Sequence, residues 1–180
     1  MFVNRRRARL AVGALAAVLV ASCGGASGEE VPAGPAGTQA FADLARDHVQ
    51  RDVEYPQSPP VGGPHHPVWQ NCGVYRDPIA DENAVHSMEH GAVWIAYGDE
   101  LDDEAVAALE TLARERTHVL VAPYPALGAE IVATGWGRQL RVDDATDARL
   151  AEFVATFEQG PQTPESGAPC SGGLGTPVRA

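Results

Sequence analysis

The stretch that decides the fold runs from residue 91 to residue 97 and reads G-A-V-W-I-A-Y. It combines β-branched and aromatic residues without a charge, a composition typical of a buried strand. Residues 118–122 read H-V-L-V-A and form a second apolar run, which Pro123 and Pro125 follow. Because proline cannot donate a hydrogen bond within a sheet, we expect the second strand to end there. These two strands predict a sheet at the centre of the domain.

Helical patterns flank the two strands. Residues 99–116 open with acids, place apolar residues three and four apart and end in two arginines, which predicts a helix. Residues 147–159 have an amphipathic pattern and are followed by Gly160 as a C-cap, which predicts another. Residues 41–51 also show helical spacing.

Further strands are expected over 131–134 and 136–142, and five prolines make residues 55–67 a long, extended loop. The order helix, loop, strand, helix, strand, strand, helix predicts a small α+β domain. We expect a short sheet of about three to five strands with two or three packed helices. This single domain is assigned to residues 41–172.

The first 23 residues are typical of an export signal. An arginine-rich start precedes the apolar run Leu10 to Val20, which is too short to span a membrane. The residues that follow, up to Cys23, resemble the lipobox of bacterial lipoproteins, which implies cleavage before Cys23 and a lipid on its sulfur. Lipid chains would hold the protein at the outer face of the cell membrane. The alternative is an ordinary cleavable signal peptide with an incidental cysteine.

Both ends of the mature chain are poor in residues that can be buried. Residues 24–40 consist mostly of Gly, Ala, Ser, Pro, Glu and Thr, which predicts a flexible tether between the lipid and the domain. We expect residues 173–180 to be a disordered tail.

The charge of the chain is strongly acidic. It carries 13 Lys+Arg, every one an arginine, against 24 Asp+Glu, for a formal net charge of −11. An acidic surface repels phosphate backbones, so nucleic acid is not an expected partner. The membrane, reached through the N-terminal lipid, is the one partner that the sequence predicts.

Two cysteines remain if Cys23 carries a lipid. Cys72 and Cys170 are then an even pair in an oxidising compartment, where they can form a disulfide. We favour the disulfide because Cys170 has no other evident use in a segment so poor in core residues. The alternative is that Cys72 is a free thiolate ligand beside the histidines.

The segment H-S-M-E-H at residues 86–90 carries the most chemistry, and it allows two geometries. On a helix, His86, Glu89 and His90 share a face and match the H-x-x-E-H pattern of inverted zincin-type metallopeptidases. On a strand, His86, Met88 and His90 share a face and offer two imidazoles and a thioether, a set suited to copper. Because a glycine and a β-branched run follow, we expect the strand geometry, with Glu89 pointing the other way.

The proline-rich loop and the first predicted helix add further imidazoles. His65 and His66 point to opposite sides of an extended stretch, so at most one of them can join a site, and His48 can supply another. Glu89 would orient a ligand histidine through a hydrogen bond. The expected ligands for copper or zinc are His65, His86 and His90, with His48 and Met88 in reserve. The alternative is that these histidines only satisfy buried backbone groups.

Three stretches of the chain, 59–65, 69–75 and 84–95, resemble the domain of unknown function 3105 family, above all through the motif H-S-x-E-H-G. The likeness extends over residues 48–170. It implies an exported or membrane-tethered bacterial protein, often from high-GC actinobacteria, and it supplies no activity. In that family the signature positions correspond to His48, His65, His86, Glu89 and His90. Met88 falls where leucine is also at home, and Cys72 and Cys170 occur together in the actinobacterial form, which suits the disulfide.

The sequence therefore predicts a cell-envelope lipoprotein, anchored at the extracytoplasmic face of the membrane, with a histidine-lined site for copper or zinc. We expect a binding protein rather than an enzyme. A second hypothesis is a structural or interaction module of the envelope whose histidines serve the fold. A third, a metal-dependent hydrolase, requires Glu89 on the same side as two histidines.

Overall fold

The computed structural model describes Met1 and residues 30–127 and 130–178. Apart from Met1, the predicted signal peptide lies outside these residues, as do Cys23, where lipidation is predicted, and residues 24–29 of the predicted tether. Within the described part of the chain, no helix is long and apolar enough to cross a membrane.

The domain is a small α+β fold, as predicted. Its sheet has six strands in the order β1-β6-β5-β3-β4-β2, and three helices pack against it. In chain order the elements are β1 (Gln39–Ala40), β2 (Gly73–Val74), α1 (Asp81–Glu89), β3 (Val93–Tyr97), α2 (Asp103–Ala113), β4 (Val119–Pro123), β5 (Ile131–Gly135), β6 (Arg138–Val142) and α3 (Ala148–Phe157).

The central strands lie where the apolar runs predict them. β3 pairs in parallel with β4 and antiparallel with β5, and β5 forms an antiparallel hairpin with β6. Two-residue strands at the edges, β1 and β2, bring the sheet to more strands than the expected three to five.

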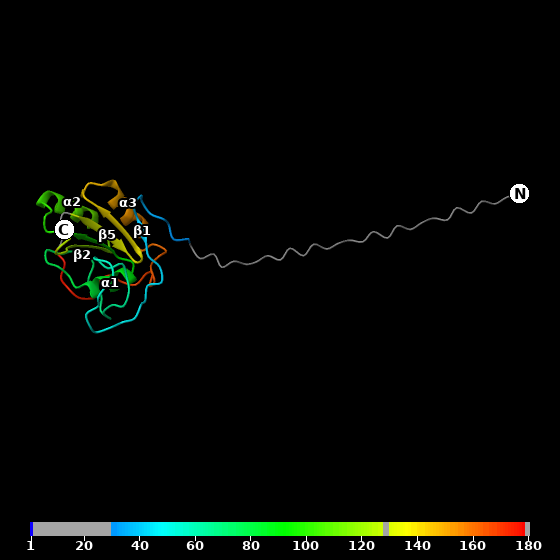
Figure 1. Cartoon of the computed structure of the whole chain (residues 1–180), viewed down its shortest axis with the longest axis horizontal. Helices are drawn as coiled ribbons and strands as arrows, with labels where there is room; N and C mark the ends of the chain where they lie inside the picture. The colour runs from blue at the N-terminus through cyan, green and yellow to red at the C-terminus, as the bar shows by residue number, and fades with distance from the viewer. Residues whose placement is uncertain (2–29, 128–129, 179–180) are drawn as a thin grey trace.

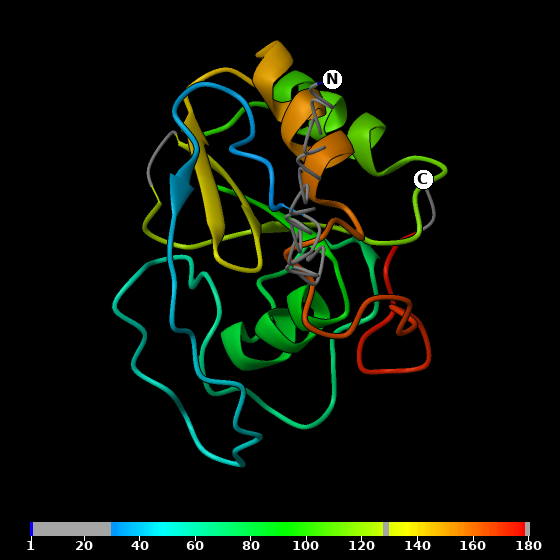
Figure 2. The same ribbon diagram turned by 90° about the vertical axis from the view of Figure 1, so that its right-hand side faces the viewer.

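The sheet separates two apolar clusters. Figure 1 shows helices α2 and α3 on one side of the sheet and α1 on the other. Helices α2 and α3 cover one face, where Leu109 and Phe153 pack against β3, β4 and β5. Helix α1 covers the other face, where Val85 and Met88 pack with Trp94. The proline-rich loop and the C-terminal segment lie on this second side, beside α1 (Figure 2).

The expectation of a strand at residues 86–90 is wrong, because these residues lie in α1 and its C-cap. Gly91, with φ of 97°, ends the helix. Gly91 N donates to Met88 O and Ala92 N donates to Ser87 O, the hydrogen-bond pair of a Schellman motif. A glycine in this conformation reverses the chain at once, so a helix and a buried strand can follow each other with almost no linker.

The helix expected over residues 41–51 is absent, since this segment is irregular. His48 instead forms an isolated parallel bridge with His65 of the proline-rich loop. The main-chain groups that a helix would have used are thus partly taken by a distant segment, and this tertiary pairing outweighs the local helical spacing.

Both terminal segments are more ordered than predicted where they are described. Gln39–Ala40 of the expected tether form β1 and pair with β6, and Pro35 is buried. Within the expected disordered tail, Leu174 N donates to Trp69 O and Val178 N donates to Val74 O. Short main-chain pairings with neighbouring segments order these residues in spite of their low apolar content.

Candidate metal centre

His48 and His65 come from two irregular segments that pair through their main chains. Val49 N donates to His65 O at 2.7 Å, and His65 N donates to Asp47 O at 3.0 Å. This pairing brings the two imidazole rings side by side, with centroids 4.9 Å apart. The side chain of His65 is fully buried, whereas that of His48 is 46% exposed.

Helix α1 supplies His86, Glu89 and His90, which share one side because they are three and four residues apart. Glu89 Oε2 lies 2.8 Å from His65 Nε2 and 3.7 Å from His48 Nε2. His48, His65, His86 and Glu89 each offer one ligand atom, and these atoms all lie within 4.8 Å of one another. We call these four residues the inner site.

Main-chain carbonyls fix the orientation of three of the histidines. The Nδ1 atoms of His65, His86 and His90 lie 2.8, 2.7 and 2.8 Å from the carbonyl oxygens of Gly63, His66 and Pro169, respectively. A carbonyl oxygen can only accept a hydrogen bond, so each of these Nδ1 atoms carries the proton. When such a ring is neutral, its Nε2 atom is unprotonated and carries a lone pair. This is the form of histidine that binds a metal.

When the rings are neutral, the Nε2 atoms of His65 and His86 face no hydrogen-bond donor. His65 Nε2 is buried without a hydrogen bond of acceptable geometry, although Glu89 Oε2 is close to it. His86 Nε2 lies 3.0 Å from His90 Nε2, so two lone pairs face each other. Burial, together with the neighbouring histidines, lowers the pKa of His86 to about 4, so its ring is neutral at pH 7. A cation at the inner site would take up the lone pairs of His65 and His86.

The donor set of the inner site is three imidazoles and one carboxylate. Borderline divalent ions such as Zn²⁺ take this combination, with Zn–N and Zn–O bonds of about 2.0–2.2 Å. The carboxylate also offsets part of the charge of the ion, which matters because three of the four residues are buried. The inner site can therefore hold a divalent transition metal.

The structure brings together most, but not all, of the residues that the sequence singled out. His90 lies beside His86 but outside the inner site. Met88 is fully buried in the apolar cluster with Trp94, away from the donor atoms, so its thioether is not placed as a ligand. His66 also points elsewhere, and its Nδ1 accepts from Val68 N. Of the two adjacent histidines, His65 alone lies among the converging donors.

The expectation that Glu89 points away from the histidines is wrong. It follows from the mistaken strand geometry, because a strand alternates its side chains whereas α1 places residues 86, 89 and 90 together. Glu89 is buried, and its carboxylate contacts His65 directly.

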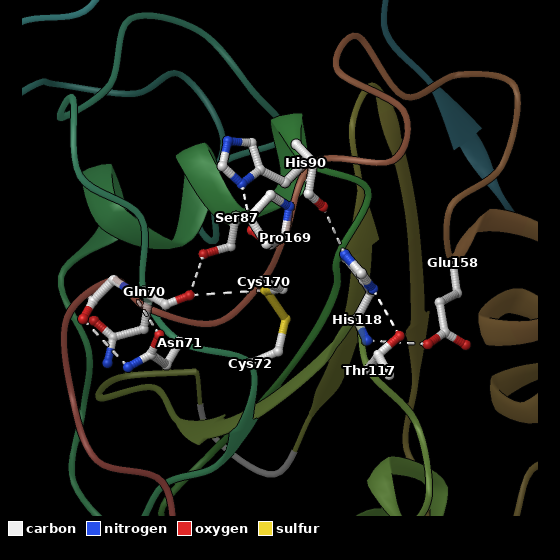
Figure 3. The surroundings of a disulfide bond; sticks show 12 residues. Gln70, Asn71, Cys72, Ser87, His90, Thr117, His118, Glu158, Pro169 and Cys170 are labelled. Atoms are coloured by element: carbon white, nitrogen blue, oxygen red, sulfur yellow. Dashed lines mark hydrogen bonds between the residues drawn. A yellow bond between two sulfur atoms is a disulfide. The ribbon is translucent and has the colours of Figure 1, made fainter.

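The predicted disulfide joins Cys72 and Cys170, so Cys72 is not a free thiolate. It holds the C-terminal segment against the end of α1 (Figure 3). Cys72 N donates to Cys170 O, and the preceding carbonyl, that of Pro169, receives the hydrogen bond from His90. The disulfide therefore fixes a group that orients one of the histidines.

Sequence reasoning missed two contributors to the site. Glu165 Oε2 lies 3.5 Å from His90 Nε2, and the ring of Trp69 packs against His90 at a centroid distance of 4.8 Å. Glu165 belongs to the segment that the disulfide ties down. The presence of Cys170 five residues later was the one signal that this segment returns to the domain.

The chain matches a family model described as "Protein of unknown function (DUF3105)" over residues 48–172. It belongs to this family. The DUF3105 match begins at His48 and covers every residue of the inner site as well as Cys72, Glu165 and Cys170. The chain matches no curated protein and no solved structure.

Proposed function

We propose that this DUF3105 protein binds one divalent transition-metal ion at the inner site, with zinc as the first candidate. The observation that carries the proposal is the convergence of imidazole lone pairs. His65 and His86 have their protons held at Nδ1 by main-chain carbonyls, and their Nε2 atoms meet Glu89 in a buried place. Such carbonyl contacts are what fixes the rings of metal-binding histidines in general.

The donor types disfavour Cu(I), but they suit both zinc and Cu(II). Cu(I) prefers thiolate and thioether ligands, and the thioether of Met88 packs in the core instead. Cu(II) takes imidazole and carboxylate, and it outranks zinc in affinity at most sites of this kind. Competition between the two ions therefore needs to be measured with the copper in both oxidation states.

We further propose that the protein works as a lipoprotein at the extracytoplasmic face of the membrane. The basic start, the short apolar run and the lipobox-like residues before Cys23 support this location. A disulfide between Cys72 and Cys170 is in keeping with an oxidising compartment.

The helical geometry also meets the spacing of the H-x-x-E-H peptidases. In those enzymes, however, the glutamate acts on water, whereas here Glu89 contacts His65 and is one of the converging donors. We therefore propose metal binding rather than hydrolysis.

The test is isothermal titration of metal-free, untagged protein with Zn²⁺, together with elemental analysis. We expect one equivalent to bind. His48→Gln is the variant of choice, because His48 is the half-exposed ligand and its loss perturbs the fold least. It should weaken binding by about 10- to 100-fold, or about 1.4 to 2.7 kcal/mol.

The matched control is His66→Gln, which changes the neighbouring histidine that faces away from the site. It should bind zinc like the native protein. If the native protein shows no saturable binding, the histidines serve the fold alone, and zinc also fails to raise the melting temperature of the native protein. If His48→Gln and the native protein bind zinc equally, His48 is not a ligand and the inner site as defined is wrong.

A further inference from the structure

A second set of donors lies next to the inner site and reaches the surface. It consists of His86, His90 and Glu165. His90 Nε2 lies 3.0 Å from His86 Nε2 and 3.5 Å from Glu165 Oε2. The two imidazoles are buried, whereas the side chain of Glu165 is 52% exposed.

The two imidazole rings and the main chain of Glu165 are held in place independently of any ion. The ring of His90 is fixed through its Nδ1 at Pro169 O, and Glu165 N donates to Glu89 O at 3.0 Å. The indole of Trp69 packs against the rings of His90 and His86, with centroid distances of 4.8 and 5.7 Å. The separations of His90 Nε2 from His86 Nε2 and from Glu165 Oε2 are those of neighbouring ligands around one ion with bonds of about 2.1 Å.

His86 belongs to both sets of donors. Its Nε2 atom has one lone pair and can bind one ion at a time. The outer set and the inner site are therefore two overlapping positions for a single ion rather than two independent sites. Each position pairs His86 with one carboxylate, Glu165 outside and Glu89 inside, so that negative charge accompanies the ion in both.

We propose that His86, His90 and Glu165 form a loading position through which a metal ion passes into the inner site. This inference rests on the proposed function. The half-exposed Glu165 meets the hydrated ion at the surface, and His90 and His86 replace part of its water. His86 then remains a ligand while Glu89 and His65 replace the outer donors. Stepwise exchange avoids stripping all the water from the ion at once, which would be costly for a buried site.

The experiment measures the rate and the equilibrium of Zn²⁺ binding in Glu165→Gln, a variant that keeps the shape of the side chain and removes its charge. Stopped-flow tryptophan fluorescence gives the rates, since Trp69 packs on His86 and His90. We expect association to slow by about tenfold, within the range that a local charge gives to on-rates. Dissociation should slow by the same factor, so that the dissociation constant stays within about twofold of the native value, because the passage changes and the final site does not.

Glu152→Gln is the matched control. Glu152 is an exposed carboxylate on α3, at the other face of the sheet, and its loss changes the net charge equally. It should leave both rates unchanged.

Two results would overturn the loading position while leaving the inner site in place. One is an association rate in Glu165→Gln equal to that of the Glu152→Gln control. The other is a weaker dissociation constant with an unchanged association rate, which would make Glu165 a ligand of the final complex. Absence of saturable zinc binding to the native protein would instead remove the proposed function itself, so the two failures are distinguishable.

Discussion

Three histidines, His65, His86 and His90, are oriented in the same way. In each, Nδ1–H donates to a main-chain carbonyl, and Nε2 of the neutral ring is left unprotonated. In the metal-free protein this arrangement has an energetic cost. A buried, bare nitrogen loses its hydrogen bond to water, and the 3.0 Å approach of His86 Nε2 to His90 Nε2 sets two lone pairs against each other. Residues arranged for the fold alone would have one ring turned to donate to the other.

The pKa of His86 gives a prediction at this scale. Burial lowers it from the ordinary 6.5 to about 4, so between these pH values the unfolded chain binds more protons at this residue than the folded protein does. The free energy of unfolding of the metal-free protein should therefore fall on acidification through this window. The stabilisation that depends on a neutral His86 is fully present above pH 6.5. By pH 4 the free energy of unfolding should have fallen by on the order of 3 kcal/mol through this residue.

Urea unfolding of metal-free protein at a series of pH values measures this effect. Carboxylates titrate in the same window, so the informative quantity is the difference between the native protein and His86→Gln. The native curve should be the steeper one between pH 6.5 and 4. Parallel curves would contradict the prediction and would mean that His86 is charged without penalty.

At the scale of elements, the sequence predicts those parts that have a strong local pattern. The apolar run that becomes β3 and the amphipathic repeat that becomes α3 both appear where they are expected, since burial on one face imposes the pattern directly. The disulfide is also confirmed, and it was predictable because assigning Cys23 to the lipid leaves a single pairing of the other two cysteines.

The site is less predictable because long-range pairing forms it. The segment around His48 has helical spacing but is irregular, since its main chain pairs with that of His65. Helix α1 was missed because it is only nine residues long and Gly91 ends it at the boundary with a strand-like run. The strand geometry that we expected for residues 86–90 then gave the wrong direction for the Glu89 side chain.

Gly91 provides a prediction for this junction. Its φ of 97° disfavours any residue with a side chain, and a Cβ atom there would lie 3.1 Å from Gln159 Cα and closer still to the side-chain amide of Gln159. That amide also donates to His90 O, so the junction and α3 would have to separate. We expect Gly91→Ala to lower the free energy of unfolding by about 3 kcal/mol, from backbone strain and overpacking together.

The matched control for this variant is Gly172→Ala. Gly172 has a similar φ of 85°, but a Cβ atom there meets nothing within 4 Å. Its substitution should cost only the backbone strain, about 1–2 kcal/mol. Urea unfolding of both variants isolates the packing contribution, and equal losses would contradict the close contact with Gln159.

At the scale of the whole molecule, the site depends on segments far apart in the chain that the disulfide keeps together. Cys72 and Cys170 are 98 residues apart in sequence, and the bond between them closes most of the domain. The segment just before Cys170 carries two groups that reach the end of α1, namely Pro169 O and Glu165. His118 Nε2 also binds this segment, at Ala168 O, from the start of β4 (Figure 3).

Removal of the disulfide should therefore affect stability and metal binding through different routes. In the chain-entropy model a closed loop of this length contributes about 4–5 kcal/mol to the free energy of unfolding, so Cys72→Ala/Cys170→Ala should lose a large part of that amount. Zinc should still bind to the fraction that stays folded, because the inner site does not include the C-terminal segment. Its association should slow as in Glu165→Gln, because the freed segment no longer holds Glu165 at the loading position or Pro169 O at His90.

Measuring unfolding and zinc association on the same sample, at a temperature where the variant is folded, separates these effects. A variant that loads zinc at the native rate would show that the C-terminal segment has no part in metal entry.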